Sequence, residues 1–193
     1  GWSALAPMTA PRGSHAAVTL PGGKVLVVGG AIEDDDADDG AQSLQTAELW
    51  DPAAGAWAVL PPMSHKRAFP GCCVLPSGRV AVVGGRPATY ETCRDAEAFD
   101  PVARTWESLP PMSHDREHPG VAAVAGGLVV VGSDGHWGEA PDEVFDPDEL
   151  FDEASGRWFE LPHRMAQPRT SAHLVSLPAA AFAAPAAAGA AAQ

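Results

Sequence analysis

The sequence lacks the features that mark several large classes of protein. No apolar run approaches the roughly 20 residues that a membrane-spanning helix needs. The start of the chain has neither the basic stretch nor the apolar core of a signal peptide. The three cysteines, Cys72, Cys73 and Cys93, include no CxxC pair, so we expect reduced thiols rather than a disulfide framework or a zinc site. These absences predict an intracellular protein without a membrane segment, in the cytoplasm or the nucleus.

Basic residues are also scarce. The chain has 12 lysines and arginines against 25 aspartates and glutamates, which gives a net charge of −13. This balance argues against a nucleic-acid partner, because phosphate binding depends on clustered basic side chains. Part of the excess lies in one acidic segment, 33–39. An EF-hand loop counted from Asp34 would need Gly and Glu where Asp39 and Gln45 stand, so we expect a solvated loop there, with weak cation binding as the alternative.

Catalytic motifs are absent as well. The sequence contains no P-loop, GxSxG or HExxH motif, and we predict no catalytic residue, no metal site and no cofactor. The histidine-rich segment 114–118 is expected to be a loop, with metal binding as the alternative. Glycine and proline, in contrast, are plentiful, with 20 and 19 residues. Such a composition is typical of many short strands joined by tight turns, and it argues against a helical bundle.

The sequence does contain an internal repeat. Trp57 and Trp106 lie 49 residues apart, and the segments that follow them nearly match. Four copies of this segment occur, as W-S-A-L-A-P-M-T-A-P-R (2–12), W-A-V-L-P-P-M-S-H-K-R (57–67), W-E-S-L-P-P-M-S-H-D-R (106–116) and W-F-E-L-P-H-R-M-A-Q-P-R (158–169). Self-similarity at this period indicates a repeat protein in which each unit packs on its neighbours.

Each unit predicts four short strands. In the first unit, apolar segments 15–20 and 24–28 flank a Pro-Gly-Gly turn, and segments 46–50 and 56–60 flank a second turn. A Val-Val-Gly-Gly motif at 27–30 recurs in the next unit, and we expect its glycines where the backbone turns tightly or approaches a neighbour. An aromatic residue and the tryptophan seven residues later are expected to pack between adjacent units. The pattern predicts one four-stranded antiparallel sheet per unit.

Two motifs identify the type of repeat. V-T-L-P-G-G-K-V-L-V-V-G-G (18–30) and V-L-P-S-G-R-V-A-V-V-G-G (74–85), with A-E-L-W-D-P and A-E-A-F-D-P after them, closely resemble kelch repeats of the galactose-oxidase-like type. The resemblance covers residues 2–178, and it implies an all-β fold, the kelch-type β-propeller, in which each four-stranded sheet is one blade.

The resemblance also implies an incomplete ring. Three complete blades are expected, with single flanking strands and a disordered Ala/Pro-rich tail at 179–193. The expected blades span about 13–61, 68–110 and 117–162, and the flanking strands span 2–5 and 170–177. Three blades do not easily close a ring. Further blades would come from a longer protein, from a second copy by self-association, or not at all.

Charged residues are concentrated in the loops at one end of the predicted blades. In an up-and-down blade, the loops after the second and fourth strands emerge at the same end, and long charged loops on a rigid scaffold are where binding usually resides. The arginines that recur in every unit, at 12, 67, 116 and 169, are expected to serve the fold by hydrogen-bonding loop carbonyls. The candidate binding residues at this end are Lys66, Arg67, Arg86, Tyr90, Arg94, Arg116, His136 and Trp137. Trp137 lies outside the repeat pattern. We expect its side chain either to anchor a contact with a partner or to fold back onto the blades as a plug.

These features favour a non-catalytic interaction module that presents its loop end to a partner protein. Kelch domains commonly recruit substrates to ubiquitin ligases or act as scaffolds, which is what the resemblance implies here. The resemblance also implies an alternative, a fragment of a galactose-oxidase-like copper enzyme. That chemistry needs tyrosine and histidine copper ligands and a tyrosine–cysteine crosslink. The chain offers only Tyr90, near Cys93, and no second tyrosine.

Overall fold

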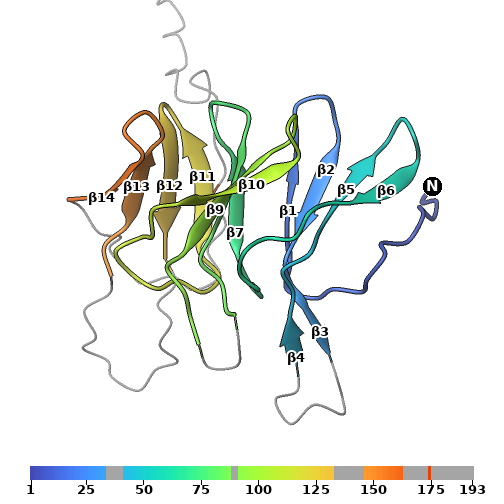
Figure 1. Cartoon of the computed structure of the whole chain (residues 1–193), viewed down its shortest axis with the longest axis horizontal. Helices are drawn as coiled ribbons and strands as arrows, with labels where there is room; N and C mark the ends of the chain where they lie inside the picture. The colour runs from blue at the N-terminus through green and yellow to red at the C-terminus, as the bar shows by residue number, and fades with distance from the viewer. Residues whose placement is uncertain (34–40, 88–90, 133–145, 163–173, 175–193) are drawn as a thin grey trace, which may run out of the picture.

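The computed structural model describes residues 1–33, 41–87, 91–132, 146–162 and 174, and within them the regular secondary structure consists entirely of β-strands. Three four-stranded antiparallel sheets stand side by side (Figure 1). Each sheet has the simple up-and-down strand order of a propeller blade. In the described part of the chain, no helix is long and apolar enough to cross a membrane. The predicted all-β fold of four-stranded, propeller-type blades is confirmed.

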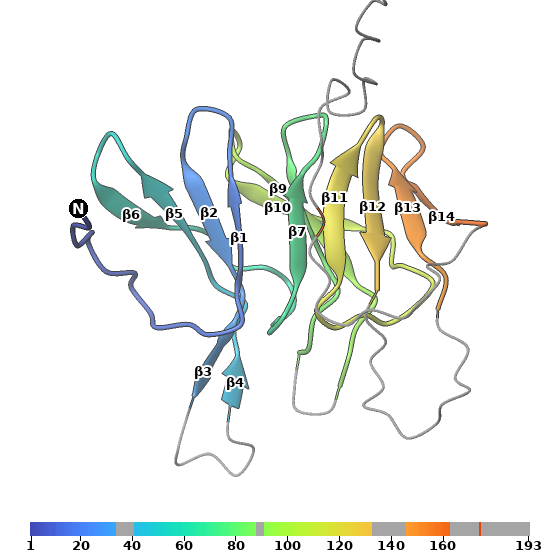
Figure 2. The same ribbon diagram turned by 180° about the vertical axis from the view of Figure 1, so that it is seen from behind.

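The three blades follow one another along the chain. Blade 1 joins β1, β2, β5 and β6, which are Ala16–Thr19, Val25–Val28, Ala47–Asp51 and Ala56–Val59. Blade 2 joins β7, β8, β9 and β10, which are Gly71–Val74, Val80–Val83, Ala96–Asp100 and Thr105–Leu109. Blade 3 joins β11, β12, β13 and β14, which are Gly120–Val124, Gly127–Val131, Glu149–Asp152 and Arg157–Glu160. The inner strands β1, β7 and β11 lie side by side (Figure 2).

A short hairpin that the sequence analysis did not predict projects from blade 1. Strand β3 (Ala31–Glu33) pairs with β4 (Ala41–Ser43), and the acidic residues between them, 34–40, lie outside the described residues. The amide of Ala31 donates to the Gly13 carbonyl, and the amide of Gly13 donates to the Ala31 carbonyl, each at 2.8 Å. Three-residue strands are too short to show an alternating pattern, which is why the sequence did not reveal them.

The second strand of each blade is packed on both faces, and the glycines after it are required by the next blade. All four residues of β8 are buried, as the uninterrupted apolar run predicts. Gly29 and Gly84 follow β2 and β8 with φ of 65° and 63°. A Cβ on Gly29 would lie 2.4 Å from the carbonyl oxygen of Arg67, and one on Gly84 would lie 2.5 Å from that of Arg116. These glycines therefore both turn the chain and admit the neighbouring blade, as predicted.

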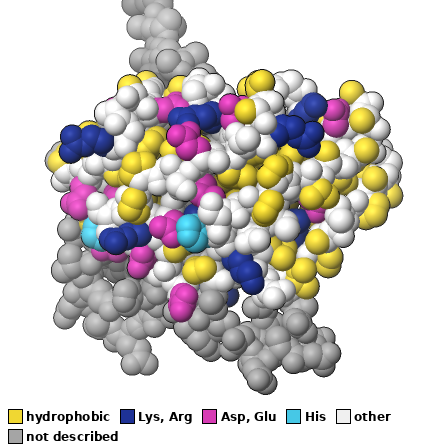
Figure 3. All heavy atoms as spheres, viewed as in Figure 1, with side chains coloured by type: hydrophobic (Ala, Val, Ile, Leu, Met, Phe, Trp, Pro, Cys, Tyr) yellow, Lys and Arg dark blue, Asp and Glu magenta, His cyan; other side chains and the backbone are white. Residues whose placement is uncertain are grey.

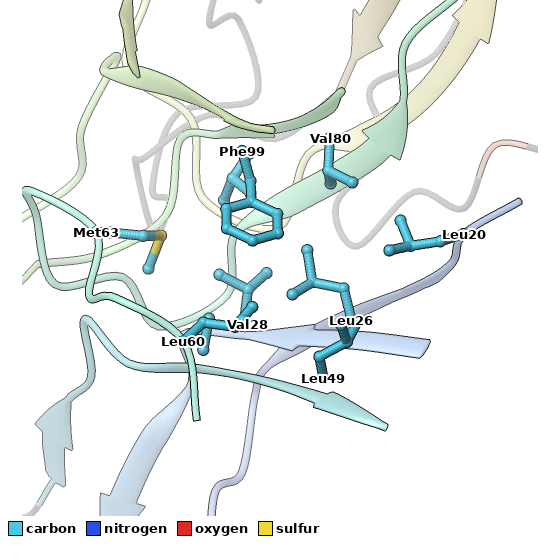
Figure 4. Packing of buried hydrophobic residues seen from close by; sticks show 10 residues of the cluster. Leu20, Leu26, Val28, Leu49, Leu60, Met63, Val80 and Phe99 are labelled. Atoms are coloured by element: carbon cyan, nitrogen blue, oxygen red, sulfur yellow. The ribbon is translucent and has the colours of Figure 1, made fainter. Parts of the chain in front are cut away.

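Two apolar cores hold the blades together, one at each interface. Between blades 1 and 2, side chains of β2 and β5 pack against those of β8 and β9 (Figure 4). This core contains Leu20, Leu26, Val28, Leu49, Leu60, Met63, Val80, Val82 and Phe99. The second core joins the other face of blade 2 to blade 3, and it contains Leu75, Ala81, Val83, Met112, Leu128, Val130 and Phe151. Each blade interface thus buries a continuous apolar surface.

The aromatic residue and the tryptophan of each unit form a ring pair. The ring centroids of Phe99 and Trp106 are 5.0 Å apart, and those of Phe151 and Trp158 are 5.1 Å apart. Both pairs belong to the cores between blades, which confirms their predicted position. The indole N–H of Trp106 also donates to the Pro61 carbonyl at 2.8 Å, in the segment that leaves the preceding blade. Apolar packing and one hydrogen bond therefore tie each outer strand to its neighbour.

The predicted strand at Trp2–Leu5 is wrong. Residues 1–8 have no strand conformation, and Trp2 and Leu5 are highly exposed. In the other copies of this segment the tryptophan pairs with an aromatic residue of its own sheet, whereas Trp2 has no such sheet beside it among the described residues. Without a hydrogen-bonded neighbour, β-propensity alone does not form a strand. The second predicted flanking strand, 170–177, and the tail at 179–193 lie almost wholly outside the described residues.

Candidate functional site

The long connections between strands all emerge at one end of the three blades, which we call the loop end. They follow the second and fourth strands, and the β3–β4 hairpin projects from the same end (Figure 1). The opposite end, the turn end, carries short hairpin turns. At Asp51 and Asp100, the carboxylate accepts hydrogen bonds from amides two and three residues later. This arrangement of the loops agrees with the one predicted from the repeat.

The repeated arginines at the loop end are buried inside the fold. The side chain of Arg67 is fully buried, and its guanidinium donates to the Gly84 carbonyl at 2.8 Å and the Asp95 carbonyl at 2.9 Å. It also forms an ion pair with Glu97 at 3.0 Å. Arg12 pairs with Glu48 and Arg116 pairs with Glu149 in the same way, at 2.8 Å and 3.1 Å. Each arginine therefore connects the loop after the second strand to the third strand of its blade.

This burial corrects part of the predicted binding set. Arg67 and Arg116 were candidates for contacts with a partner, but their side chains are 0% and 1% exposed and their guanidinium groups are engaged inside the blades. The structural interpretation of the recurring arginines applies to both residues, and to Arg12. Each guanidinium instead orders the connecting loops, because it donates several N–H groups to their carbonyl oxygens and to the paired carboxylate.

The paired glutamates also order the segment that leads into each blade. The carboxylate of Glu97 accepts the Ser64 amide at 2.8 Å, and that of Glu48 accepts the Thr9 amide at 2.8 Å. Burial alone would raise the pKa of Glu97, but the Ser64 amide and the Arg67 guanidinium together hold it below its usual value. The same balance holds the pKa of Glu48 below its usual value. Both carboxylates are thus fixed as anions at neutral pH.

Three of the predicted binding residues are described and accessible. Lys66 and Arg94 are exposed at the loop end, and Arg86 is partly exposed. Within the described ranges, neither Lys66 nor Arg94 takes part in an ion pair, so their charges face solvent. Arg86 instead lies 3.5 Å from Glu117 and 5.0 Å above the ring of Phe69. The remaining candidates, Tyr90, His136 and Trp137, lie outside the described residues.

A second set of residues at the loop end was missed by the sequence analysis. Ser14, Phe69 and His118 each stand two residues after a recurring arginine, and their φ angles are 52°, 54° and 53°. The Phe69 amide donates to the Ser14 carbonyl at 2.8 Å, and the His118 amide donates to the Phe69 carbonyl at 3.1 Å. This chain of hydrogen bonds runs from blade to blade beside the inner strands. The signal was present in the repeat alignment, because one position there carries three different side chains.

These residues line a cavity of about 500 Å³ at the loop end of the inner strands. The imidazole of His118 stacks on the ring of Phe69, with centroids 3.8 Å apart, and this stacked pair forms one wall of the cavity. Burial lowers the pKa of His118 below its usual value, and Arg86 adds to this effect while Glu117 opposes it. The cavity is lined by Ser14, His15, Ala16, Ala17, Phe69, Pro70, Gly71, Cys72, His118, Pro119, Val121 and Leu174. It therefore combines aromatic, apolar and imidazole surfaces.

The possible metal ligands and the cysteine thiols among the described residues bear on the alternative of a copper enzyme. No group of three or more His, Cys, Asp or Glu side chains in the described ranges is arranged to hold a metal ion. Burial raises the pKa of Cys72 and of Cys73 to about 12, so these thiols are protonated at neutral pH. Burial also raises the pKa of Cys93, although the nearby Arg67 opposes the shift.

The turn end has a different character from the loop end. Arg79 forms ion pairs with Glu107 at 2.8 Å and with Glu153 of the next blade at 2.9 Å. Lys24 pairs with Asp51 at 2.9 Å. Basic and acidic side chains accordingly lie next to one another along this end in Figure 3. Charges that neutralise each other locally offer a partner little net attraction.

The up-and-down blades, the cores between them and the buried Arg–Glu pairs define a β-propeller segment built from sequence repeats. Comparisons with known proteins agree with this class. Kelch motif family models match residues 11–64 and residues 67–113, which together make up just over half of the chain. The chain belongs to the kelch-repeat family.

Two similar proteins illustrate the relationship. The chain is 34% identical over 90 residues to Kelch-like protein 9 from Mus musculus, which is 47% of this chain and 14% of that protein. The solved structure of YjhT matches with a TM-score of 0.71 and 15% identity, over 88% of this chain and 57% of that one. The second likeness is one of fold alone. The chain spans only a part of both relatives.

Proposed function

We propose that the protein is a non-catalytic interaction module that binds a partner protein at its loop end. The observation that carries this proposal is the contrast between the two ends of the blades. At the loop end, the buried Arg–Glu pairs fix the backbone of the connections, while Lys66 and Arg94 remain exposed and unpaired among the described residues. A rigid scaffold that presents uncompensated charges is suited to binding, because little order is lost when a partner docks.

The membership in the kelch-repeat family supports the same function. A role as a substrate-recruiting adaptor of a ubiquitin ligase, or as a scaffold, is the finer form of this proposal. It rests on the kelch resemblance, and the chain covers only 14% of the Kelch-like relative's length. Recruitment would place the loop end against the recruited protein.

The test is affinity capture with matched charge variants, followed by binding measurements on the proteins captured. The double variant Lys66→Glu, Arg94→Glu should lose at least about tenfold in affinity for a specific partner, since rim charges of both residues would be reversed. Arg157→Glu is the control, because Arg157 is an exposed residue of β14 next to a turn at the other end. Partner binding that is unaffected by the double variant but lost in the control would refute the proposal.

A further inference from the structure

At the loop end, one position of the repeat has the same backbone conformation in all three blades but a different side chain in each. Ser14, Phe69 and His118 share a left-handed backbone conformation, and all three line the same cavity. A non-glycine residue in this conformation costs about 1–2 kcal/mol. The hydrogen bonds from the Phe69 and His118 amides to the preceding blade explain why the conformation is kept. They do not explain the choice of side chain, because a backbone hydrogen bond needs none.

Two residues that also differ from their counterparts in the other repeats contact the aromatic wall of the cavity. Arg86 lies over the ring of Phe69, and Glu117 lies 3.7 Å from the imidazole Nδ1 of His118. Glu117 is 4% exposed, and its Oε1 atom has no hydrogen-bond partner among the described residues. The Arg86–Glu117 distance of 3.5 Å is long for a charge-assisted hydrogen bond. An under-satisfied buried carboxylate is costly, and such a cost is typical of functional positions.

His15 also lines the cavity and is exposed to solvent. Nδ1 of His15 lies 3.1 Å from the Arg12 carbonyl oxygen. Because a carbonyl can only accept, a hydrogen bond at this distance requires the proton on Nδ1, and in that tautomer Nε2 is a hydrogen-bond acceptor. Pro70 and Pro119 add apolar surface beside the two aromatic rings. A flat aromatic group that carries a hydroxyl matches this combination of aromatic rings, apolar surface and a hydrogen-bond acceptor.

We infer that this cavity receives a tyrosine side chain of the partner protein. An aromatic ring gains dispersion and quadrupole interactions against the Phe69–His118 wall, and its phenolic O–H can donate to His15. The inference rests on the proposed function, since a partner at the loop end supplies the tyrosine. Arg86 and Glu117 act as positioning residues for the wall. Arg86, predicted to contact a partner directly, would thus act through Phe69.

The test uses N-acetyl-tyrosinamide as the probe and the histidine ring signals in NMR spectra of the full chain. We expect saturable shifts of the His118 and His15 signals on titration. N-acetyl-phenylalaninamide should bind about fivefold more weakly, which corresponds to one hydrogen bond of about 1 kcal/mol. N-acetyl-leucinamide should bind more weakly still, because it cannot stack.

Two variants and a control connect the shifts to the cavity. Ser14→Phe fills the cavity with a side chain that the equivalent position of the next blade already carries. His118→Asn removes half of the wall while keeping a residue that tolerates positive φ. Each should weaken the probe at least about tenfold. Phe159→Ala, at a 45% exposed aromatic on an outer strand, should change nothing. Thermal unfolding curves confirm that each variant is folded.

Several results would overturn the inference. They are the absence of saturable shifts, equal binding of the leucine and tyrosine probes, and full binding by folded Ser14→Phe. The outcome is separable from that of the charge-variant experiment. A partner lost from the Lys66 and Arg94 double variant but indifferent to Ser14→Phe would leave the interaction module intact and reject the tyrosine pocket. Probe binding without any partner at the loop end would reject the interaction module instead.

Discussion

At the scale of single residues, the most consequential feature is the buried Arg–Glu pair that recurs in each blade. The sequence marked Arg67 as a repeated residue and displayed the Glu97 motif, but it did not reveal that the two meet. The residues between them differ in number from blade to blade, so no fixed spacing links arginine to glutamate. Only the closed blade brings them to 3.0 Å. Because both charges are buried, loss of either partner leaves an uncompensated charge, which is more costly than the pair is favourable.

The same pairs make stability depend on pH. Burial alone would raise the pKa values of Glu97 and Glu48. Hydrogen bonds from backbone amides and from the paired arginine outweigh burial and hold both pKa values below the ordinary value of 4.5. A carboxylate with a lowered folded-state pKa stabilises the fold fully above its ordinary pKa, and this contribution is lost as the pH falls through the folded-state value. We expect the urea midpoint to be flat near neutral pH and to fall below about pH 4.5. Glu97→Gln should be less stable at pH 7 and should show a shallower acid decline. A midpoint that rises on acidification would contradict this assignment.

At the scale of the strand and blade, the outer tryptophans decide how one sheet is attached to the next. Trp106 contacts Phe99 in its own blade, and its indole N–H reaches the segment that leaves blade 1. The spacing of seven residues between them suffices to predict the ring pair, since antiparallel strands joined by a tight turn place them opposite each other. The hydrogen bond to Pro61 was not predictable, because it depends on the path of the preceding blade.

Trp106→Ala should therefore destabilise the chain strongly. We expect a loss of about 3–5 kcal/mol in the free energy of unfolding, the usual cost of removing a large aromatic side chain from a core. Trp106→Phe should cost less, since it retains most of the ring contact and loses the hydrogen bond. Phe159→Ala, on an exposed part of β14, is the matched control and should lie within about 0.5 kcal/mol of the parent chain. A similar loss in the control and in Trp106→Ala would disprove the special role of the tryptophan.

At the scale of the whole molecule, the two ends of the blades have separate roles. At the turn end the hairpin turns are short and Arg79 is paired with Glu107 and Glu153. The loop end carries the long connections and the aromatic cavity. A row of rigid blades can support variable loops without losing stability, because the cores lie between the sheets and not beneath the loops. The predicted contact residue Trp137 belongs to one of these loops by sequence, and its role remains a prediction.

Trp137→Ala is expected to weaken partner binding while leaving the melting temperature within a few degrees of the parent value. The reason is that Trp137 lies outside the repeat pattern that supplies the cores between blades, and loop tryptophans commonly anchor interfaces. Calorimetry on the isolated chain and a binding titration with a captured partner separate the two effects. A loss of stability equal to that of Trp106→Ala would place Trp137 in the core.

The sequence by itself determined the number of complete blades, the order of their strands and the end at which the long loops emerge. These follow from local signals, namely turn residues, apolar segments and a period that repeats. Tertiary structure decided everything that depends on contacts across blades. The side chains of Arg67 and Arg116 are buried, and residues 2–5 form no strand. The cavity wall is formed by Phe69 and His118, which come from different blades. Those two residues are 49 positions apart, and only the stacking of blade on blade places their rings in contact.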